Sequence, residues 1–388
     1  MIETLSGAPT GAAVTHRVAL AGSAGDLAVS SCAVERVPHR LAAEWQALAD
    51  RASEPNCFAE PWFVDAGLQH LRAGEVRVIE VRDRGQLIGL LPVAHATGYA
   101  RLPVRHVVNW THHHHFLGTP LVHAGREAAF WRVVLAHLDE HESAAAFLHV
   151  NGLVADGPMH RGLLGARPSA ATVHRHCRAE LRSTLAPAAY YAAAVRKKKR
   201  KELQRLRNRL AELGAVAVRR WAPPEPVAPW CDAFLTLERS GWKGAAGSAL
   251  ACQPATDAFF RAALAGAGAA GRLDMLRLEL DGHPLAVLVT FRTPPGAFSF
   301  KIAFDEAFAR FSPGVLLEIE NLAVLADPEI AWTDSCAAPD HPMIDGLWTE
   351  RREIVRVSVP LRGLRRRAIY QGCRLLEAGS ALRRRLAQ

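Results

Sequence analysis

The sequence predicts an α+β fold with mixed, mostly antiparallel sheets, arranged as two similar domains. Strand-like and helical segments alternate along 388 residues, a length that suggests two to three domains. Asp281-Gly282, the favoured two-residue hairpin turn, separates two apolar runs. Each half repeats the order helices, hairpin, strand, helix and strand, so we expect a duplication that joins near residues 178–190. The expected organisation is a flexible leader at 1–27, an N-terminal domain at 28–180, a C-terminal domain at 181–360 and an arginine-rich tail at 361–388.

The first half opens with a strand at 27–37 and a helix at 40–52. In that helix Leu41, Trp45 and Leu48 are spaced by four and three residues, which is helical periodicity. Pro61 suits the first turn of the next helix. A Gly-containing turn at 83–85 predicts a hairpin. The remaining elements expected here are helix 61–71, strands 76–81 and 86–94, strand 104–110, helix 127–141 and strand 147–150.

The second half opens with one long helix at 187–213. Its leucines recur at intervals of three, four and three residues from 203 to 213, opposite a basic face, and Gly214 ends it. Ser312-Pro313-Gly314 opens another helix that runs to about residue 326. The remaining elements expected here are strand 216–221, helices 229–239 and 256–264, strands 273–280, 283–291 and 297–304, and strands 330–332 and 352–359.

The composition excludes several classes of protein. Hydrophobic residues make up 49% and charged residues 22%, as in ordinary globular chains. No stretch approaches the roughly 18 uninterrupted apolar residues that a membrane-spanning helix needs. The seven cysteines are odd in number and form no C-x-x-C pair, which argues against a disulfide framework and a zinc ribbon. A reducing cytoplasm is therefore the expected compartment.

The positive charge is concentrated in two segments. The net charge is +9, of which residues 196–201 carry +6 and residues 361–388 carry +7, so the remainder is −4. Such segments favour polyanions: cofactor phosphates, RNA or an anionic membrane surface. The tail mixes its arginines with leucines. Three possibilities remain for this tail: an amphipathic helix on the surface of the inner membrane, packing against the body of the protein, and disorder.

Several motifs carry a family resemblance. They are NCFAEPW at 56–62, LIGLLP at 87–92, KKKRKELQRLRNRLAELG at 197–214, ERSGWKG at 238–244, FKIAFDEAFARFSPGVLL at 300–317 and Trp332-Thr333-Asp334. Over about residues 28–360 the chain resembles the cellulose-synthesis-associated (CelD/BcsL-type) acetyltransferase family of the GNAT superfamily, which is related to FemABX-type aminoacyl transferases. The resemblance implies two tandem GNAT-like domains and an acyl-CoA donor, acetyl or longer, held in the C-terminal domain.

One departure from that pattern stands near the C-terminal end of the second domain. Relatives follow the Asp-bearing segment, about nine residues on, with a Tyr-Lys pair and then a Trp. Here the pair falls on Met343-Ile344, with Trp348 beyond. If the lysine assists catalysis in relatives, this chain uses another group or has changed its acceptor.

The start of the helix near residue 313 is the predicted donor site. Ser312 is a good N-cap, Pro313 fits the first helical position, and Gly314 lets a ligand approach the backbone. The amides from Gly314 to Leu317 are expected to be free at the positive end of the helix dipole, where they would bind phosphate. The residues predicted to hold the donor are Arg310, Ser312, Gly314, Val315 and Leu316.

Acyl transfer to an amine needs a base that removes the amine proton and a group that stabilises the oxyanion. The residues weighed as bases are Glu238, Asp305, Asp334 and His283, and the assigned catalytic residues are Glu238, Lys301 and Asp305. Substrate contacts are assigned to Trp242, Lys243 and Asp334. No metal is expected, because side chains of the run 112–115 alternate in an extended segment and no further ligand follows at a suitable spacing.

The sequence therefore favours an acyl-CoA-dependent N-acyltransferase that acts on an amine of a sugar, peptide or amino acid. Two alternatives remain. A FemABX-like transferase would use aminoacyl-tRNA held by the two basic segments, and a non-catalytic GNAT-like scaffold would bind an anionic partner.

Overall fold

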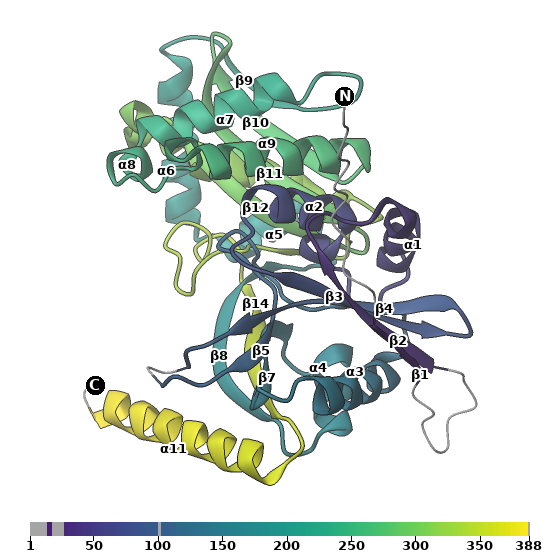
Figure 1. Ribbon diagram of the computed structural model, residues 1–388. Coiled ribbons are helices and arrows are strands. Elements are labelled where there is room, and N and C mark those ends of the chain that lie inside the picture. The colour runs from purple at the N-terminus through teal and green to yellow at the C-terminus, as the bar shows by residue number, and fades with distance from the viewer. Residues whose placement is uncertain (1–13, 18–26, 100–101, 387–388) are drawn as a thin grey trace, which may run out of the picture. The chain divides into compact units, whose positions relative to one another are not determined.

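The computed structural model describes residues 14–17, 27–99 and 102–386 (Figure 1). The chain divides into two compact units. Unit 1 comprises residues 1–54, 72–174 and 355–388, and unit 2 comprises residues 55–71 and 175–354. This division differs from the expected one in three segments, since residues 55–71 and 175–180 belong to unit 2 and residues 355–360 belong to unit 1.

Unit 1 is a mostly antiparallel sheet with helices packed on it. Its strands follow the order β1-β2-β3-β4-β5-β7-β14, with β6 paired to β4. The turn between β3 and β4 has positive φ at Arg84 and Gly85, as a two-residue hairpin turn requires. The elements are β1 (Val14–Arg17), β2 (Leu27–Val34), α1 (His39–Ala49), β3 (Val76–Asp83), β4 (Gln86–Ala96), β5 (His106–Asn109), β6 (Leu121–Val122), α3 (Glu127–His141), β7 (Phe147–Val154), α4 (Pro158–Ala166) and α11 (Leu364–Leu386).

Helices α3 and α4 cover the apolar face of this sheet. Trp131, Leu135 and Leu138 of α3 pack with Ile79 and Val81 of β3 in one fully buried cluster. The strands β8 (Ala171–Leu181) and β14 (Glu350–Pro360) run through both units.

Unit 2 holds the other sheet segment, in the order β8-β13-β12-β11-β10-β9. Asp281 and Gly282 have positive φ and join β10 to β11 in the expected hairpin. The elements are η1 (Cys57–Ala59), α2 (Pro61–His70), α5 (Pro187–Ala194), α6 (Lys197–Ala211), β9 (Val216–Arg220), α7 (Ala228–Ser240), α8 (Trp242–Ala245), η2 (Leu250–Cys252), α9 (Pro254–Ala269), β10 (Leu273–Leu280), β11 (His283–Thr293), β12 (Gly296–Phe304), η3 (Glu306–Phe311), α10 (Pro313–Asn321), η4 (Leu322–Ala326) and β13 (Trp332–Asp334).

Aromatic rings pack α2 and α9 with the strands of unit 2. Phe63 of α2 lies 5.4 Å from Phe259 of α9 and 6.1 Å from Phe300 of β12, measured between ring centroids. Figure 1 shows α7 and α9 lying across β10 and β11. Leucines of α6 and α10, among them Leu210 and Leu317, form a second cluster with leucines of β10 and β11.

The structure differs from the expected secondary structure in three segments. The single helix at 187–213 is two helices, because Val195 is extended and its buried side chain joins the core around Tyr190 and Trp348. The leader at 1–27 contains the strand β1, while 1–13 and 18–26 lie outside the described residues. The tail at 361–388 forms the helix α11.

Candidate active site

The parallel strands β12 and β13 of unit 2 are paired over only the first part of β12. Their pairing runs from Gly296 and Trp332 to Phe298 and Asp334. The pairing with β13 ends six residues before β12 itself ends at Phe304. Beyond Phe304 the chain forms η3 and then α10. The C-terminal part of β12 therefore has an edge that β13 does not cover, next to the start of a helix.

A hollow of about 220 Å³ lies over the first turn of α10. Its walls come from β12, η3, α10 and the segment after β13, and its lining residues are Phe304, Ala309, Ser312, Pro313, Gly314, Val315 and Met343. A Cβ added to Gly314 would lie 3.4 Å from Met343 Sδ and from Phe304 Cδ1, an ordinary contact distance. The packing around Gly314 therefore leaves room beside its backbone. Met343, the first residue of the Met343-Ile344 pair at which the sequence departs from the resemblance, lines this hollow.

The start of α10 matches the predicted donor site in part. Pro313 occupies the first helical turn and Ser312 stands at the N-cap, in the left-handed conformation and without a side-chain capping bond. The Leu316 amide, expected to be free, donates to Ser312 O at 3.0 Å, because that bond closes the first turn. The amides that a helix start leaves without an intrahelical partner here are those of Gly314 and Val315. Arg310 is exposed, with its guanidinium 4.8 Å from the centroid of the Phe311 ring.

A buried carboxylate organises the second part of the site. Glu238 of α7 is 6% exposed. Its Oε1 accepts from Lys243 Nζ at 2.9 Å, and its Oε2 accepts from the Leu250 amide at 2.8 Å. Trp242 beside it is 64% exposed. Glu238 thus holds Lys243 in place and fixes the loop that follows it.

Lys301 of β12 belongs to the same group of charges. The pKa of Lys301 is lowered from 10.5 to about 8, because burial, together with the charge of Lys243, outweighs Glu238 and Cys336, which raise it. The next residues of the strand, Ile302 and Ala303, line a small hollow of about 40 Å³ with Glu238, Trp242 and Lys243. Phe304 lines both hollows. The structure therefore brings Glu238, Trp242, Lys243 and Lys301 together and places them beside the predicted donor site.

Asp334 has a structural environment that leaves no face for a substrate. Its side chain is 0% exposed. Oδ1 lies 2.6 Å from Arg178 Nε, and Oδ2 lies 2.7 Å from Arg178 Nη2 and 3.5 Å from Arg352 Nη1. Oδ1 also accepts from the Cys336 amide at 3.0 Å. Asp334 therefore joins β13 to β8 and β14, and these contacts favour a buried ionic link over the predicted substrate contact.

The two further candidate bases, Asp305 and His283, line neither of the two hollows. Asp305 Oδ1 accepts from the Ala307 amide at 2.9 Å, so this carboxylate caps η3. His283 is exposed at the start of β11. Their predicted parts in proton transfer remain predictions, and the contacts favour a capping role for Asp305.

Glu318 is a buried acid that the sequence analysis did not single out. It lies one turn after Gly314 on α10 and is 1% exposed, and Asn321 Nδ2 donates to its Oε2 at 3.1 Å. Burial raises the pKa of Glu318 from 4.5 to about 7, although the bond from Asn321 lowers it. The sequence signal for this residue is weak. Glu318 is an acid among the apolar residues of α10, three positions after Val315 and directly after Leu317.

The raised pKa of Glu318 predicts a pH-dependent stability. The folded protein holds this proton more tightly than the unfolded chain, so the free energy of unfolding falls as pH rises from about 4.5 to about 7. Glu318→Gln removes that titration and is expected to stabilise the protein at pH 8 by up to about 3 kcal/mol, with no gain at about pH 4. Urea unfolding at both pH values measures this. The exposed Glu212→Gln is the matched control, and an equal effect at both pH values would contradict the account.

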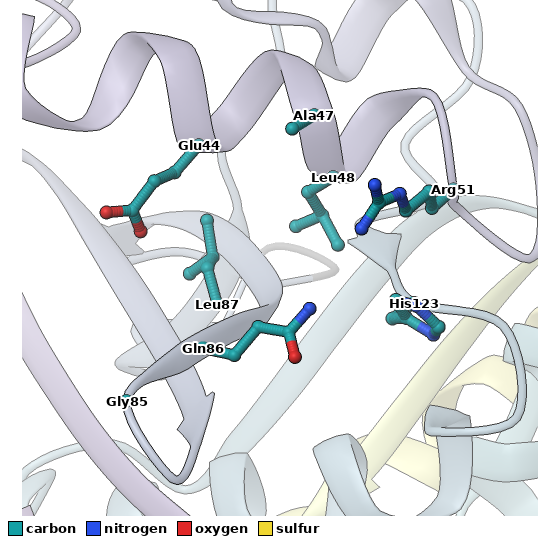
Figure 2. A pocket seen from close by; sticks show the side chains of 8 residues that line it. All are labelled: Glu44, Ala47, Leu48, Arg51, Gly85, Gln86, Leu87 and His123. Atoms are coloured by element: carbon teal, nitrogen blue, oxygen red, sulfur yellow. The ribbon is translucent and has the colours of Figure 1, made fainter.

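Unit 1 has a hollow of its own, of about 250 Å³, between α1 and the start of β4. In Figure 2 Glu44 lies on one side of it and Arg51 and His123 lie on the other. Glu44 already pairs with Arg82, Oε2 to Nη1, at 2.6 Å. None of the predicted site residues lines this hollow.

The histidine run lies in a loop of unit 1. Burial lowers the pKa of His112 to about 2 and that of His115 to about 4, so both rings are neutral near pH 7. The rings of His112 and Trp110 lie 5.6 Å apart between centroids. Within the described part of the chain no group of three or more His, Cys, Asp or Glu side chains could hold a metal ion.

Residues 197–341 match the family model described as "Acetyltransferase (GNAT) domain". No curated protein matches the chain. Among solved structures, the chain is similar to FemX, with a TM-score of 0.56 and 10% identity over 87% of this chain and 98% of that one. A conserved protein of unknown function from Bacteroides thetaiotaomicron has a TM-score of 0.54 and 10% identity, over 84% and 99%.

The C-terminal domain of a putative lysylphosphatidylglycerol synthetase from Agrobacterium fabrum has a TM-score of 0.52 and 12% identity, over 87% of this chain and 96% of that one. At such identities the likeness concerns the fold alone, and it agrees with the predicted α+β fold, in which a large mixed sheet is flanked by helices. The segment that matches the GNAT domain contains Glu238, Lys243, Lys301 and the start of α10. The part of the chain that is similar to the GNAT family model therefore lies within unit 2.

Proposed function

We propose that the protein is an acyl-CoA-dependent N-acyltransferase whose donor binds in unit 2. The observation that carries the proposal is the hollow over the first turn of α10, next to the edge of β12 that β13 leaves uncovered. Two free amides at the positive end of a helix dipole suit a phosphate group. An uncovered strand edge offers backbone hydrogen bonds to an extended arm, as in the binding of peptides to sheet edges.

The reaction would proceed by direct attack of a neutral amine on the thioester carbonyl carbon. The C–N bond forms, the C–S bond breaks, and the CoA thiolate takes up a proton. We assign removal of the amine proton to Lys301, because a group whose pKa lies near the working pH makes the best base. Glu238 would position Lys243, whose charge beside the exposed Trp242 would bind an anionic group on the acceptor.

The lining of the hollow bears on the donor. Phe304, Pro313, Val315 and Met343 give it an apolar wall. Ile344, which stands at the lysine position of the resembling family, is apolar and buried, which supports the assignment of the proton transfer to Lys301. Acetyl-CoA and a longer acyl-CoA remain the two donors to compare.

Gly314→Asp tests the donor site, because it places a negative charge where a phosphate would bind. Gly314 is buried, and its new side chain would meet Met343 and Phe304, so the helix-dipole gain is outweighed and some loss of stability is expected as well. The same charge would repel a bound phosphate, so the affinity for CoA is expected to fall at least about tenfold, as it does for each 1.4 kcal/mol of lost binding energy. Calorimetric titration with CoA and urea unfolding measure the two effects.

Ala228→Asp is the matched control, since it places the same charge in the first turn of α7 at an exposed position. It should leave CoA binding unchanged. If both variants bind CoA like the wild type, the donor site is not at α10. If the wild type binds bulk tRNA and not CoA, the donor is an aminoacyl-tRNA instead. If the wild type binds CoA but transfers an acetyl or octanoyl group to no amine, the scaffold alternative replaces the enzyme.

A further inference from the structure

The C-terminal helix α11 is fixed to unit 1 by one of its faces. Tyr370 and Cys373 are buried there in a cluster with Phe147 of β7. Tyr370 Oη donates to Ser358 O at 3.0 Å. Arg366 donates from Nη1 to Asp139 O at 2.9 Å and from Nη2 to Glu142 O at 2.8 Å. This inner face is therefore a packed interface within the unit.

The opposite face of α11 is apolar and exposed. Leu364 is 90% exposed and Leu375 is 75% exposed. Leu364, Ala368 and Leu375 are spaced by four and seven residues, which places them on one stripe of the helix. Seven large hydrophobic side chains stand exposed in the described residues, and three of them belong to this helix: Leu364, Leu375 and Leu376. Such clustering differs from the scattered exposure that is normal on a protein surface.

Arginines border this stripe. Arg365 and Arg367 are exposed and lie on its two sides, one residue and three residues beyond Leu364. In sequence, the tetrapeptide Leu-Arg-Arg-Arg at 364–367 recurs at 382–385, which is 18 residues on, or about five helical turns. The repeat is therefore in phase with the helix. The one acid of the segment, Glu377, contacts Tyr99 and Arg374.

We propose that the outer face of α11 binds the surface of an anionic lipid bilayer, with the helix lying in the plane of the interface. Leucines would enter the boundary between headgroups and acyl chains, and the flanking arginines would pair with lipid phosphates. Among the described residues no helix is both long and apolar enough to span a membrane. The contact would therefore be peripheral.

The charge and the apolar stripe together favour a bilayer over other occupants. Residues 361–388 carry a net charge of +7, so two copies of this helix would repel one another. RNA would use the arginines but not the leucines, and the aromatic residue of the helix, Tyr370, is on the inner face, away from any base.

Vesicle flotation of the full chain tests this proposal. We expect the protein to float with vesicles of phosphatidylcholine and phosphatidylglycerol and to stay behind with phosphatidylcholine alone. The double variant Leu364→Glu/Leu375→Glu should lower the partition coefficient at least about tenfold, since it removes the buried apolar area. Leu185→Glu/Leu213→Glu is the matched control, because it adds the same charge at exposed leucines of unit 2 and should bind like the wild type.

Arg365→Gln should lower the partition coefficient about fivefold, the factor that corresponds to one basic residue near an anionic surface. The effect should shrink as salt is added. Equal thermal midpoints for all variants would show that the fold is intact, since the replaced side chains are exposed. Equal binding to neutral and anionic vesicles, or unchanged binding of the Leu364→Glu/Leu375→Glu variant, would overturn the proposal. So would a self-associating chain whose dimer is lost in that variant.

Discussion

Replacing Lys301 by methionine is expected to lower kcat about 100-fold or more, the contribution typical of a positioned general base. The affinity for CoA should not change, because Lys301 lies outside the lining of the donor hollow. Methionine retains the length of the side chain and removes a buried charge, so the fold should keep its stability. Release of CoA from acetyl-CoA and octanoyl-CoA, with a panel of amines, measures kcat.

The pH profile separates this role from a structural one. A base must be neutral, so the rate should rise with pH and level off above about 8, where Lys301 has lost its proton. Hydroxylamine serves as the acceptor, because it is a much weaker base than an alkyl amine and stays neutral through this range. Lys301→Met should lose that inflection, while the exposed Lys198→Met on α6 should keep it. A rate that falls above pH 8 would instead mean that the charged form acts, and it would refute the assigned role.

Replacing Asp334 by asparagine should destabilise unit 2 by about 3–5 kcal/mol, because it leaves buried arginines without their counter-charge. Arg178 is 4% exposed and Arg352 is 8% exposed, so neither guanidinium is compensated by water. Urea unfolding measures the loss. Asp232→Asn is the matched control, since Asp232 pairs with Arg261 at the surface and is 62% exposed in its side chain. That control should cost about 1 kcal/mol or less.

A second variant makes the origin of the effect testable. Arg178→Met/Asp334→Leu replaces the closest buried pair by apolar side chains and should recover part of the stability lost in Asp334→Asn. Recovery will be incomplete, because Arg352 loses its ionic contact with Asp334 as well. A cost for Asp334→Asn that is no larger than that of Asp232→Asn would show that the cluster does not hold the strands together.

Local pattern was enough to predict most elements of the fold. The two-residue turn at Asp281-Gly282 fixes one hairpin, and the spacing of Leu41, Trp45 and Leu48 fixes α1, because these signals act over a few residues. The break at Val195 could not be predicted in this way. It arises from burial against Trp348, which lies far along the chain. The assignment of residues 55–71 to unit 2 has the same origin, in contacts such as that of Phe63 with Phe259.

The candidate site was predictable as a set of residues but not as a set of roles. The motif near residue 312 located the start of α10, and the residues Glu238, Lys243 and Lys301 do come together. The full engagement of Asp334 by Arg178 and Arg352 is invisible in sequence, because the three residues come from different strands. Glu318 was missed for a similar reason, since its burial depends on how α10 packs.

The most direct test of the donor site is hydrogen–deuterium exchange of the wild-type chain with and without a large excess of CoA. The account predicts slower exchange in residues 299–317, which cover the open edge of β12, η3 and the start of α10. Strands β3 and β4 of unit 1 serve as the internal reference and should exchange at the same rate in both samples. No change in residues 299–317, or protection confined to unit 1, would contradict the placement of an acyl-CoA site in unit 2.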